Sequence, residues 1–539
     1  MTASAGFQAK LRALAGRLDP FPDPGRPLFR PTPAELAVWL VFALLTLLMV
    51  RYHEPWRDEA QGFLIVRDTT LPKLILHMKY ESQFLLWFLL TWPLVRLCGM
   101  SIFGVNLVHW ALSCGTAFLI LRRAPFRLLT RAALIFTVLF AFEFTVVTRH
   151  YAIGVFLLAV LMVNWRQRFR HPVLYACGIA LCASTSLPVW VCLGGLCAAI
   201  GCEVVSRRLW TRPVFAAMLV VLFGFALALA EIYNGQGGFG SPYVSRRGTQ
   251  VAELEVMKRF QDAFDALSNL AHLPVWLCLV CFLAGALYFA WKSVPALTCF
   301  LTSAFLMISL QFVGGFHSMR HTGFLLLGTV ISCWIAALED APPAGFLSRM
   351  PKRAVVCVAA AAGCSAAILL FLQAVLTPFF VWMEVRYPFS HGHAAADFIR
   401  DNIPGDVPLF CFSARSNTSV MPWLPRRQFY IFDRKEMGTY SKWGNSQGLP
   451  LESMAIEAAS RLEPGQRYGI FVIALNEQPI PFTPPNMILL YDSRENELPV
   501  WGPYIEAFQV FAVVRQEDQG LYRPRFQNGP RTSFGPDGM

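Results

Sequence analysis

Charged residues are scarce in this chain of 539 residues: Asp, Glu, Lys and Arg together make up 15% of it, while 55% is hydrophobic. The mean hydropathy is +0.47. Soluble globular domains carry about 25% charged residues, so a fold that is soluble throughout is excluded. The composition indicates a protein that crosses a membrane many times.

The sequence also lacks the short motifs that identify several classes of protein. It has no internal repeat, no dinucleotide-binding glycine pattern and no GxxxxGK[ST] phosphate loop, and the glycine-rich run 235–240 is typical of a flexible loop. Thirteen of the 14 cysteines lie in or beside apolar segments, with Cys411 the exception, so no disulfide framework is predicted. About 30 polar and basic residues precede the first apolar segment, and a cleavable signal peptide is therefore not expected.

Basic residues outnumber acidic ones, with 46 Lys and Arg against 34 Asp and Glu and a formal net charge of +12. They fall mainly in short connectors between apolar segments. This distribution is a signal of membrane topology and not a nucleic-acid-binding face, so no nucleic-acid partner is expected.

About eleven apolar segments approach the roughly 17 to 25 residues that a bilayer span requires. If the N-terminus is inside, every inner connector has an excess of Lys and Arg, as cytoplasmic connectors do. The outer connectors are then 51–102, 148–152, the region around 188, 232–272, 314–322 and everything after about 378. The expected spans are 34–50, 103–121, 131–148, 152–165, 173–188, 189–205, 213–231, 273–291, 295–313, 322–338 and 353–376.

This topology requires that the apolar stretch 84–98 does not cross the bilayer. It is short, Pro93 interrupts it, and the amphipathic run 58–78 precedes it, so an interfacial or re-entrant helix is expected. A full span at 84–98 is the main alternative, and it would place Arg122 and its basic neighbours outside.

The chain divides into regions of different character. Short apolar runs at 407–412, 428–432, 468–474, 487–491 and 506–514 predict strands, and 393–402 and 451–462 predict helices. The expected fold is an α-helical polytopic membrane protein with a C-terminal soluble α/β domain. The regions are a basic cytoplasmic N-terminus (1–33), a transmembrane domain (34–377) whose first outer loop is 51–102, an extracytoplasmic soluble domain (378–522) and a disordered tail (523–539).

Titratable and aromatic residues gather in the outer connectors. Carboxylates beside a membrane are costly unless they face a cavity, which makes them functional candidates. A carboxylate near several cations at a lipid surface suits transfer of a group from a lipid phosphate: the carboxylate takes a proton from an acceptor hydroxyl, and the cations stabilise the departing phosphate. The candidates are His53, Glu54, Trp56, Asp58 and Glu59 in the first connector, Arg149, His150 and Tyr151 in the second, and His317, Arg320 and His321 before the tenth span.

Each candidate also has a structural interpretation. The run 51–60 fits an ordinary solvated loop, and the arginines could snorkel to the interface or contact lipid headgroups. The aromatic residues fit an interfacial belt. The histidines could be structural, or together could bind a metal ion.

With these features the chain resembles the GT-C superfamily of membrane glycosyltransferases, which use polyprenyl-phosphate-linked sugars, and in particular its aminoarabinose-transferase and protein-mannosyltransferase-like branch. The resemblance rests on the acidic pair Asp58-Glu59 after the first span, amphipathic juxtamembrane helices, about eleven spans and a soluble outer C-terminal domain. It implies transfer of a sugar, with inversion, from a polyprenyl-phosphate donor to an envelope acceptor, which could be a lipid, a polysaccharide or a protein. The reaction would take place at the outer face of a bacterial inner membrane.

The resemblance also implies roles for individual residues. Asp58 matches the family's first-loop aspartate and would be the general base, with Glu59 orienting it or a metal ion. Arg320 and His321, together with Arg149 and His150, would bind the donor phosphate. The second outer connector, 148–151, has no carboxylate where the branch often has one; a divalent metal is therefore possible but not certain, and no other cofactor is expected. Further substrate contacts would come from His53, Glu54, Trp56, Tyr151 and His317.

Two other functions stay open from the residues alone. A lipid or saccharide flippase without covalent chemistry also needs many spans and polar cavity residues. A transporter, however, often has duplicated halves and places its site near the bilayer midplane, whereas the polar residues here gather at one face. The third candidate is a ligase that attaches whole glycans or another group to an envelope acceptor.

Overall fold

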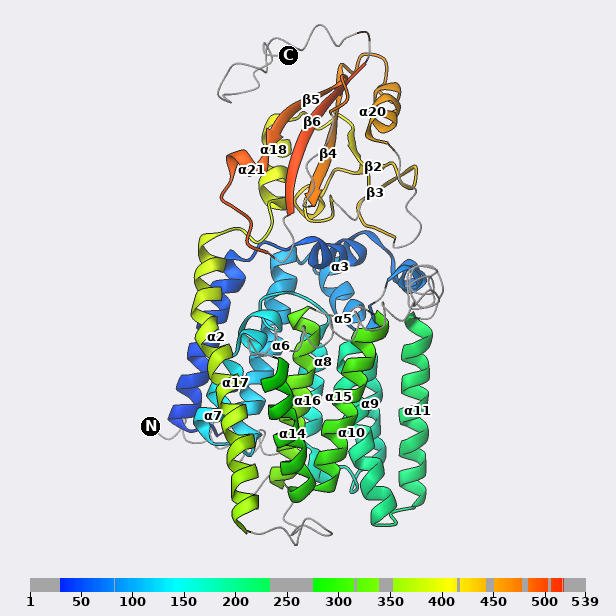
Figure 1. The fold of residues 1–539 in the computed structure, drawn as a ribbon. Helices are drawn as coiled ribbons and strands as arrows, with labels where there is room; N and C mark the ends of the chain where they lie inside the picture. Colours follow the sequence, from blue (N-terminus) through cyan, green and yellow to red (C-terminus); the bar gives the residue numbers. More distant parts are fainter. Residues whose placement is uncertain are drawn as a thin grey trace, which may run out of the picture.

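A computed structural model of the chain describes residues 30–232, 275–314, 318–338, 352–413, 417–442, 450–476, 483–502 and 506–517, apart from residues 82 and 516. It consists of a helical bundle with a small sheet domain at one end (Figure 1). Most of the expected N-terminal region, the expected disordered tail and His317 lie outside the described residues.

Seven described helices are long and apolar enough to cross a membrane, and four shorter apolar helices accompany them. The helical polytopic fold class predicted from the sequence is therefore confirmed. The long helices are α2 (Pro33–Tyr52), α6 (Ile102–Arg123), α10 (Leu187–Ser206), α11 (Arg212–Ile232), α15 (Val294–Gly314), α16 (Met319–Leu338) and α17 (Lys352–Arg386). The shorter ones are α5 (Leu85–Arg96), α8 (Tyr151–Val163), α9 (Pro172–Ala183) and α14 (Val275–Lys292).

Small residues allow the central helices to approach closely. Helix α10 packs against α15 and α16, α9 packs against α11, and α6 contacts both α2 and α8. A Cβ atom added to Gly195 of α10 would lie 2.7 Å from the carbonyl oxygen of Cys299 in α15, so only glycine fits there. Because lipid tails are as apolar as leucine, such packing replaces the hydrophobic effect as the force that holds membrane helices together.

The segment 131–148, expected as one continuous span, is broken. Helix α7 (Leu128–Ile135) is followed by a π turn (Leu139–Glu143) and then by an irregular stretch that ends at α8. The Thr137 hydroxyl donates to the carbonyl of Leu134 at 2.8 Å, and the Thr145 hydroxyl donates to that of Phe140 at 2.5 Å. Such hydroxyl bonds satisfy the carbonyls that a broken helix frees inside an apolar layer.

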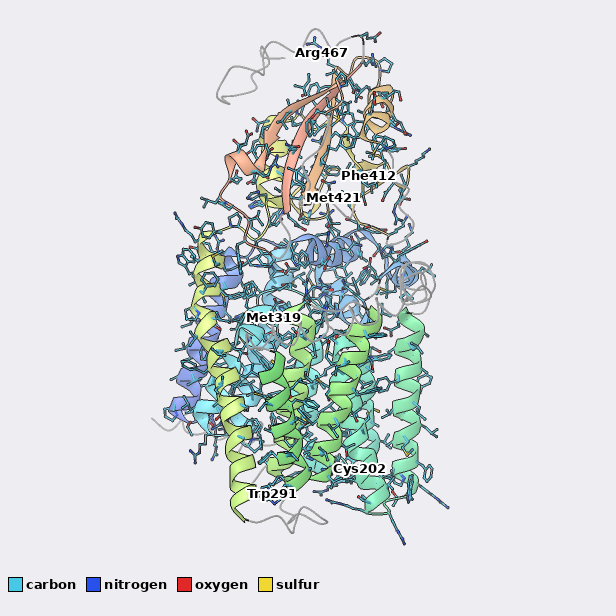
Figure 2. The ribbon with its side chains drawn as sticks, viewed as in Figure 1. Cys202, Trp291, Met319, Phe412, Met421 and Arg467 are labelled. Carbon is cyan, nitrogen blue, oxygen red and sulfur yellow. The ribbon has the colours of Figure 1, made fainter. Side chains whose placement is uncertain are left out.

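Buried ion pairs stabilise the end of the bundle far from the sheet, where Figure 2 labels Cys202 and Trp291. Glu35 pairs with Arg122 at 2.5 Å and with Arg131 at 2.9 Å. Arg168 donates to Glu203 through Nε at 2.8 Å. These arginines belong to the connectors that the charge pattern assigns to the inner side.

The C-terminal sheet has six strands in the order β3-β2-β1-β4-β6-β5. Strand β1 pairs in parallel with β2 and β4, and the other pairs are antiparallel. The five predicted strands and both predicted helices are present, and β3 was not predicted. The elements are α18 (Gly392–Asn402), β1 (Leu409–Cys411), β2 (Phe429–Ile431), β3 (Glu436–Gly438), α20 (Leu451–Ser460), β4 (Tyr468–Asn476), β5 (Met487–Asp492), α21 (Ser493–Asn496) and β6 (Glu506–Val514).

A layer of short helices separates the bundle from the sheet. The run 58–78 forms α3 (Arg57–Asp68) and α4 (Leu71–His77), and α3 lies directly under the sheet domain (Figure 1). Helix α5, in the stretch expected to be interfacial or re-entrant, has 12 residues and a length of about 18 Å, shorter than the ~30 Å apolar core of a bilayer. Asp58 and Glu59 thus lie at the junction of the two halves.

Candidate active site

The link from α2 to α3 sets the position of the acidic pair. Residues 53–56 are not helical, and α3 begins after Trp56, whose backbone N–H donates to Glu59 Oε2 at 3.1 Å. This bond back from the third helical residue satisfies one of the donors that a helix N-terminus leaves unpaired. Glu59 is thereby directed toward the chain before the helix, and the neighbouring Asp58 is directed elsewhere.

Glu59 belongs to a buried network that joins four segments. His53 Nε2 lies 2.9 Å from Glu59 Oε2, and His53 Nδ1 lies 2.6 Å from Glu384 Oε1 near the end of α17. The backbone N–H of Thr148 donates to Glu59 Oε1. His53, Glu59 and Glu384 are 6%, 5% and 2% exposed. The role of Glu59 that the geometry favours is therefore positioning, because its oxygens are already occupied.

His53 is held in its charged form by these two carboxylates. Burial alone would lower the pKa of the imidazole, but the charges of Glu59 and Glu384 outweigh it and raise the pKa from 6.5 to about 10. With both ring nitrogens protonated, His53 donates to a carboxylate on each side. The rings of Phe389 and Phe142, with centroids 4.8 Å and 6.5 Å away, surround it with apolar surface.

Asp58 forms an ion pair with Arg149, which lies in the connector before α8. Arg149 Nη1 donates to Asp58 Oδ2, and Arg57 Nε lies 3.5 Å from Oδ1. Burial raises the pKa of the Asp58 carboxyl, but the charges of Arg149, Arg57 and Arg320 outweigh burial and hold the pKa well below its usual range. Asp58 is therefore ionised at neutral pH, and three cations lie near it.

A pocket opens beside this ion pair. Its walls come from α3, α5, α6 and the connector that carries Arg149. Within the described part of the chain, the buried Oδ1 of Asn106 and the buried Oγ1 of Thr148 have no hydrogen-bond partner. Buried polar atoms are nearly always paired, and the free space here is about 10 Å³, so the two unpaired atoms are suited to one small polar group, such as a water molecule. The polar lining residues are Asp58, Glu59, Gln83, Thr91, Asn106, Thr148 and Arg149.

The predicted cation Arg320 lies close to the same centre. It is 7% exposed, and its guanidinium carbon is 4.8 Å from the centre of the Trp56 ring, a cation–π distance. Nε of Arg320 donates to Ser318 Oγ at 3.3 Å. Asp58, Arg149, Arg320 and Trp56 thus lie close together.

His321, Tyr151 and His150 form the next layer. Tyr151 OH lies 2.9 Å from His321 Nε2, and His321 Nδ1 lies 2.7 Å from Ser318 Oγ. His150 is 4% exposed, and its ring centroid is 4.5 Å from that of Tyr151. Burial, with the charges of Arg149 and His321, lowers the pKa of His150 well below its usual value. A neutral His150 can offer a phosphate a hydrogen bond but no charge.

Glu54 faces the soluble domain and not the pocket. Burial, with the charges of Glu384, Glu497 and Asp397, raises its pKa to about 8 although His53 acts in the opposite direction. Its Oε2 has no hydrogen-bond partner within the described residues. Glu54 does not line the pocket.

Other residues of the site were missed by sequence reasoning. Glu384 lies beyond 376, where the last span was expected to end; the apolar run Phe379–Met383 was the signal that α17 continues. Asn106 lies inside an apolar span and Gln83 just before one, and neither was singled out. Among the described residues, no group of three or more His, Cys, Asp or Glu side chains is arranged to hold a metal ion.

Comparison with known proteins gives matches among solved structures alone. No protein-family model and no curated protein matches the chain. The chain is similar to two crystal structures of ArnT from Cupriavidus metallidurans, a GT-C glycosyltransferase. The apo structure aligns with 11% identity and a TM-score of 0.47, and the structure bound to undecaprenyl phosphate with 12% identity and a TM-score of 0.45. Each alignment covers 89% of this chain and 97% of the other. At these values the likeness is one of overall arrangement.

The charge on His53 predicts a pH-dependent stability. Because folding raises the pKa of His53 from 6.5 to about 10, its two ion pairs contribute fully to the free energy of unfolding below pH 6.5. This contribution is lost as the pH rises through about 10. We expect His53→Gln to melt at a lower temperature than wild type at pH 6.5 and the gap between the two to shrink by pH 10. Thermal unfolding of the detergent-solubilised protein measures this gap. His393→Gln, which changes a half-exposed histidine of α18, is the control. A His53→Gln gap that stays constant over this pH range would contradict the assignment.

Proposed function

We propose that the protein is an integral-membrane glycosyltransferase that moves a sugar from a polyprenyl-phosphate-linked donor to an envelope acceptor. The observation that carries the proposal is the Asp58–Arg149 ion pair in a pocket that also holds unpaired polar atoms, at the end of the bundle next to the soluble domain. The pair supplies a carboxylate for the acceptor hydroxyl and a cation for the leaving phosphate. The acceptor would be a lipid, a polysaccharide or a protein.

In the proposed reaction the acceptor oxygen attacks the anomeric carbon on the side opposite the phosphate. The bond from that carbon to the phosphate oxygen breaks, the polyprenyl phosphate leaves with the electron pair, and the configuration inverts. The acceptor proton passes to Asp58. Arg149 and Arg320 stabilise the phosphate charge as it grows, so the leaving group needs no strong acid.

The ion pair also restrains the base until a donor binds. A carboxylate bonded to a guanidinium is a weak base, because the cation favours the ionised form. A phosphate that bound Arg149 would share the guanidinium and neutralise part of its charge, so the basicity of Asp58 would rise when the donor is in place. This coupling would suppress proton uptake by Asp58 in the empty site.

We further propose that the pocket faces the outer side of a bacterial inner membrane, with the N-terminus cytoplasmic and the C-terminal domain periplasmic. The placement of the basic connectors supports this orientation. The soluble domain and the candidate site lie at the same end of the bundle (Figure 1), so both would be extracytoplasmic.

Asp58→Asn tests the role of the base. The amide cannot take the acceptor proton, so we expect kcat for transfer to fall by about 10²- to 10⁴-fold in purified, lipid-reconstituted protein. Asp401→Asn, at an exposed position of α18, is the matched control and should transfer at the wild-type rate. Normal transfer by Asp58→Asn would remove Asp58 as base, and a wild-type protein that moves labelled donor across vesicles without transfer would favour a flippase.

Arg320→Ala tests recognition of the donor phosphate. Loss of a buried cation beside the phosphate should raise KM for the donor by about tenfold, because hydrogen bonds to charged groups contribute roughly 1.5 to 3 kcal/mol. KM for the acceptor should stay within about twofold of wild type. Arg400→Ala, an exposed arginine of α18, is the control in initial-rate measurements, and an unchanged donor KM in Arg320→Ala would count against the assignment.

A further inference from the structure

Helix α3 is built into the soluble domain as well as into the bundle. Leu64 is fully buried within the apolar core of the sheet domain, together with residues such as Ile399 and Val420. Gln61 exchanges two hydrogen bonds with the backbone of Ser441: its amide donates to the Ser441 carbonyl at 2.8 Å, and its oxygen accepts from the Ser441 N–H at 2.8 Å. The helix that carries Asp58 is therefore in direct contact with the C-terminal domain along its length.

The contact is closest at the residue before Asp58. The backbone N–H of Arg57 donates to both carboxylate oxygens of Glu506, at 3.1 and 3.2 Å, and the Thr418 hydroxyl donates to the Arg57 carbonyl at 3.0 Å. Both backbone polar groups of Arg57 are thus held by the soluble domain. Glu59 satisfies the N–H of Trp56 and Glu506 that of Arg57, so the first two donors at the start of α3 are bonded to carboxylates, which also complement the positive end of the helix dipole.

Glu506 is itself rigidly held. It is the first residue of β6 and is 2% exposed. Ser390 Oγ donates to its Oε2 at 2.9 Å, and its carbonyl accepts from the N–H of His391 at 3.0 Å. Glu506 therefore links Ser390 and His391, at the start of the soluble domain, with strand β6 and helix α3. A buried carboxylate that is bonded on several sides transmits position well, because little freedom is left to it.

We propose that the C-terminal domain is a positioning element of the active site, and that Glu506 and Thr418 fix the backbone of Arg57 and with it the direction of the Asp58 carboxylate. This inference rests on the proposed glycosyl transfer. A base displaced by about 1 Å can lose on the order of 10²-fold in rate. Through Glu506 and Thr418, the soluble domain would then affect the chemical step although neither residue touches a substrate.

The kinetic test uses Glu506→Gln and Thr418→Val in the full-length, reconstituted protein. We expect each to lower kcat by about tenfold while KM for donor and acceptor stays within about twofold. The double variant should lose less than the product of the two single effects, because both act on the same residue. Asp492→Asn is the matched control. Asp492 is a 3% exposed carboxylate of the same sheet that accepts hydrogen bonds from Arg494 and Gln509, and kcat of this variant should equal that of wild type.

A second measurement does not depend on activity. Hydrogen–deuterium exchange followed by mass spectrometry should show faster exchange of peptides covering 53–68 in Glu506→Gln and Thr418→Val than in wild type and Asp492→Asn. If Glu506→Gln does not fold, the kcat and exchange of Thr418→Val test the inference, because this variant removes one hydroxyl only. Wild-type kcat in the folded variants, or lowered kcat with unchanged exchange, would overturn the inference. Absence of sugar transfer by wild type would instead overturn the proposed function, and the exchange result would still test the contact.

Discussion

The carboxylate of Glu59 is the constraint on which the rest of the site depends. It accepts from the Trp56 N–H and the Thr148 N–H and pairs with His53, which in turn pairs with Glu384. A buried charge is expensive unless it is fully paired, and removing one partner of a buried pair typically costs about 3 to 5 kcal/mol. The first spanning helix, α3, the connector before α8 and the last spanning helix must therefore meet at this point. Because the Thr148 N–H is bonded to Glu59, the next residue, Arg149, lies beside Asp58.

Two adjacent carboxylates thus have opposite roles because their partners differ. Glu59 is enclosed by donors from its own helix start, His53 and a backbone amide, and no part of it is left for a substrate. Asp58, one residue earlier, lies beside a pocket and, among the described residues, is balanced by side-chain cations. Cations on side chains can be shared with a phosphate, whereas backbone donors inside a fold cannot move to meet one. In the proposed reaction the reactive role therefore belongs to Asp58.

The sequence predicted the elements better than their contacts. The apolar runs predicted the long apolar helices and the short strands, because length and periodicity are local properties. The break at 137–147 was missed, since Thr137 and Thr145 satisfy carbonyls in a way that hydropathy does not register. The expectation that Asp58, Arg149 and Arg320 lie close together came from the predicted topology, in which three outer connectors meet on one face of the membrane.

The parts that could not be predicted depend on residues distant in the chain. The pairing of His53 with Glu384 spans 331 residues, and that of Arg57 with Glu506 spans 449. Neither glutamate belongs to a recognisable motif. Only the packing of the soluble domain on α3 shows that a residue of the last strand contacts the residue next to Asp58.

The most direct test is a cryo-EM map of the protein in nanodiscs that contain a polyprenyl phosphate. The account predicts density for the phosphate within hydrogen-bond distance of the guanidinium groups of Arg149 or Arg320, with the lipid chain leaving between helices and the carboxylate of Asp58 free to face the aqueous end of the pocket. Phosphate density at the inner end of the bundle, or elsewhere with the Asp58–Arg149 pair unaltered, would contradict it.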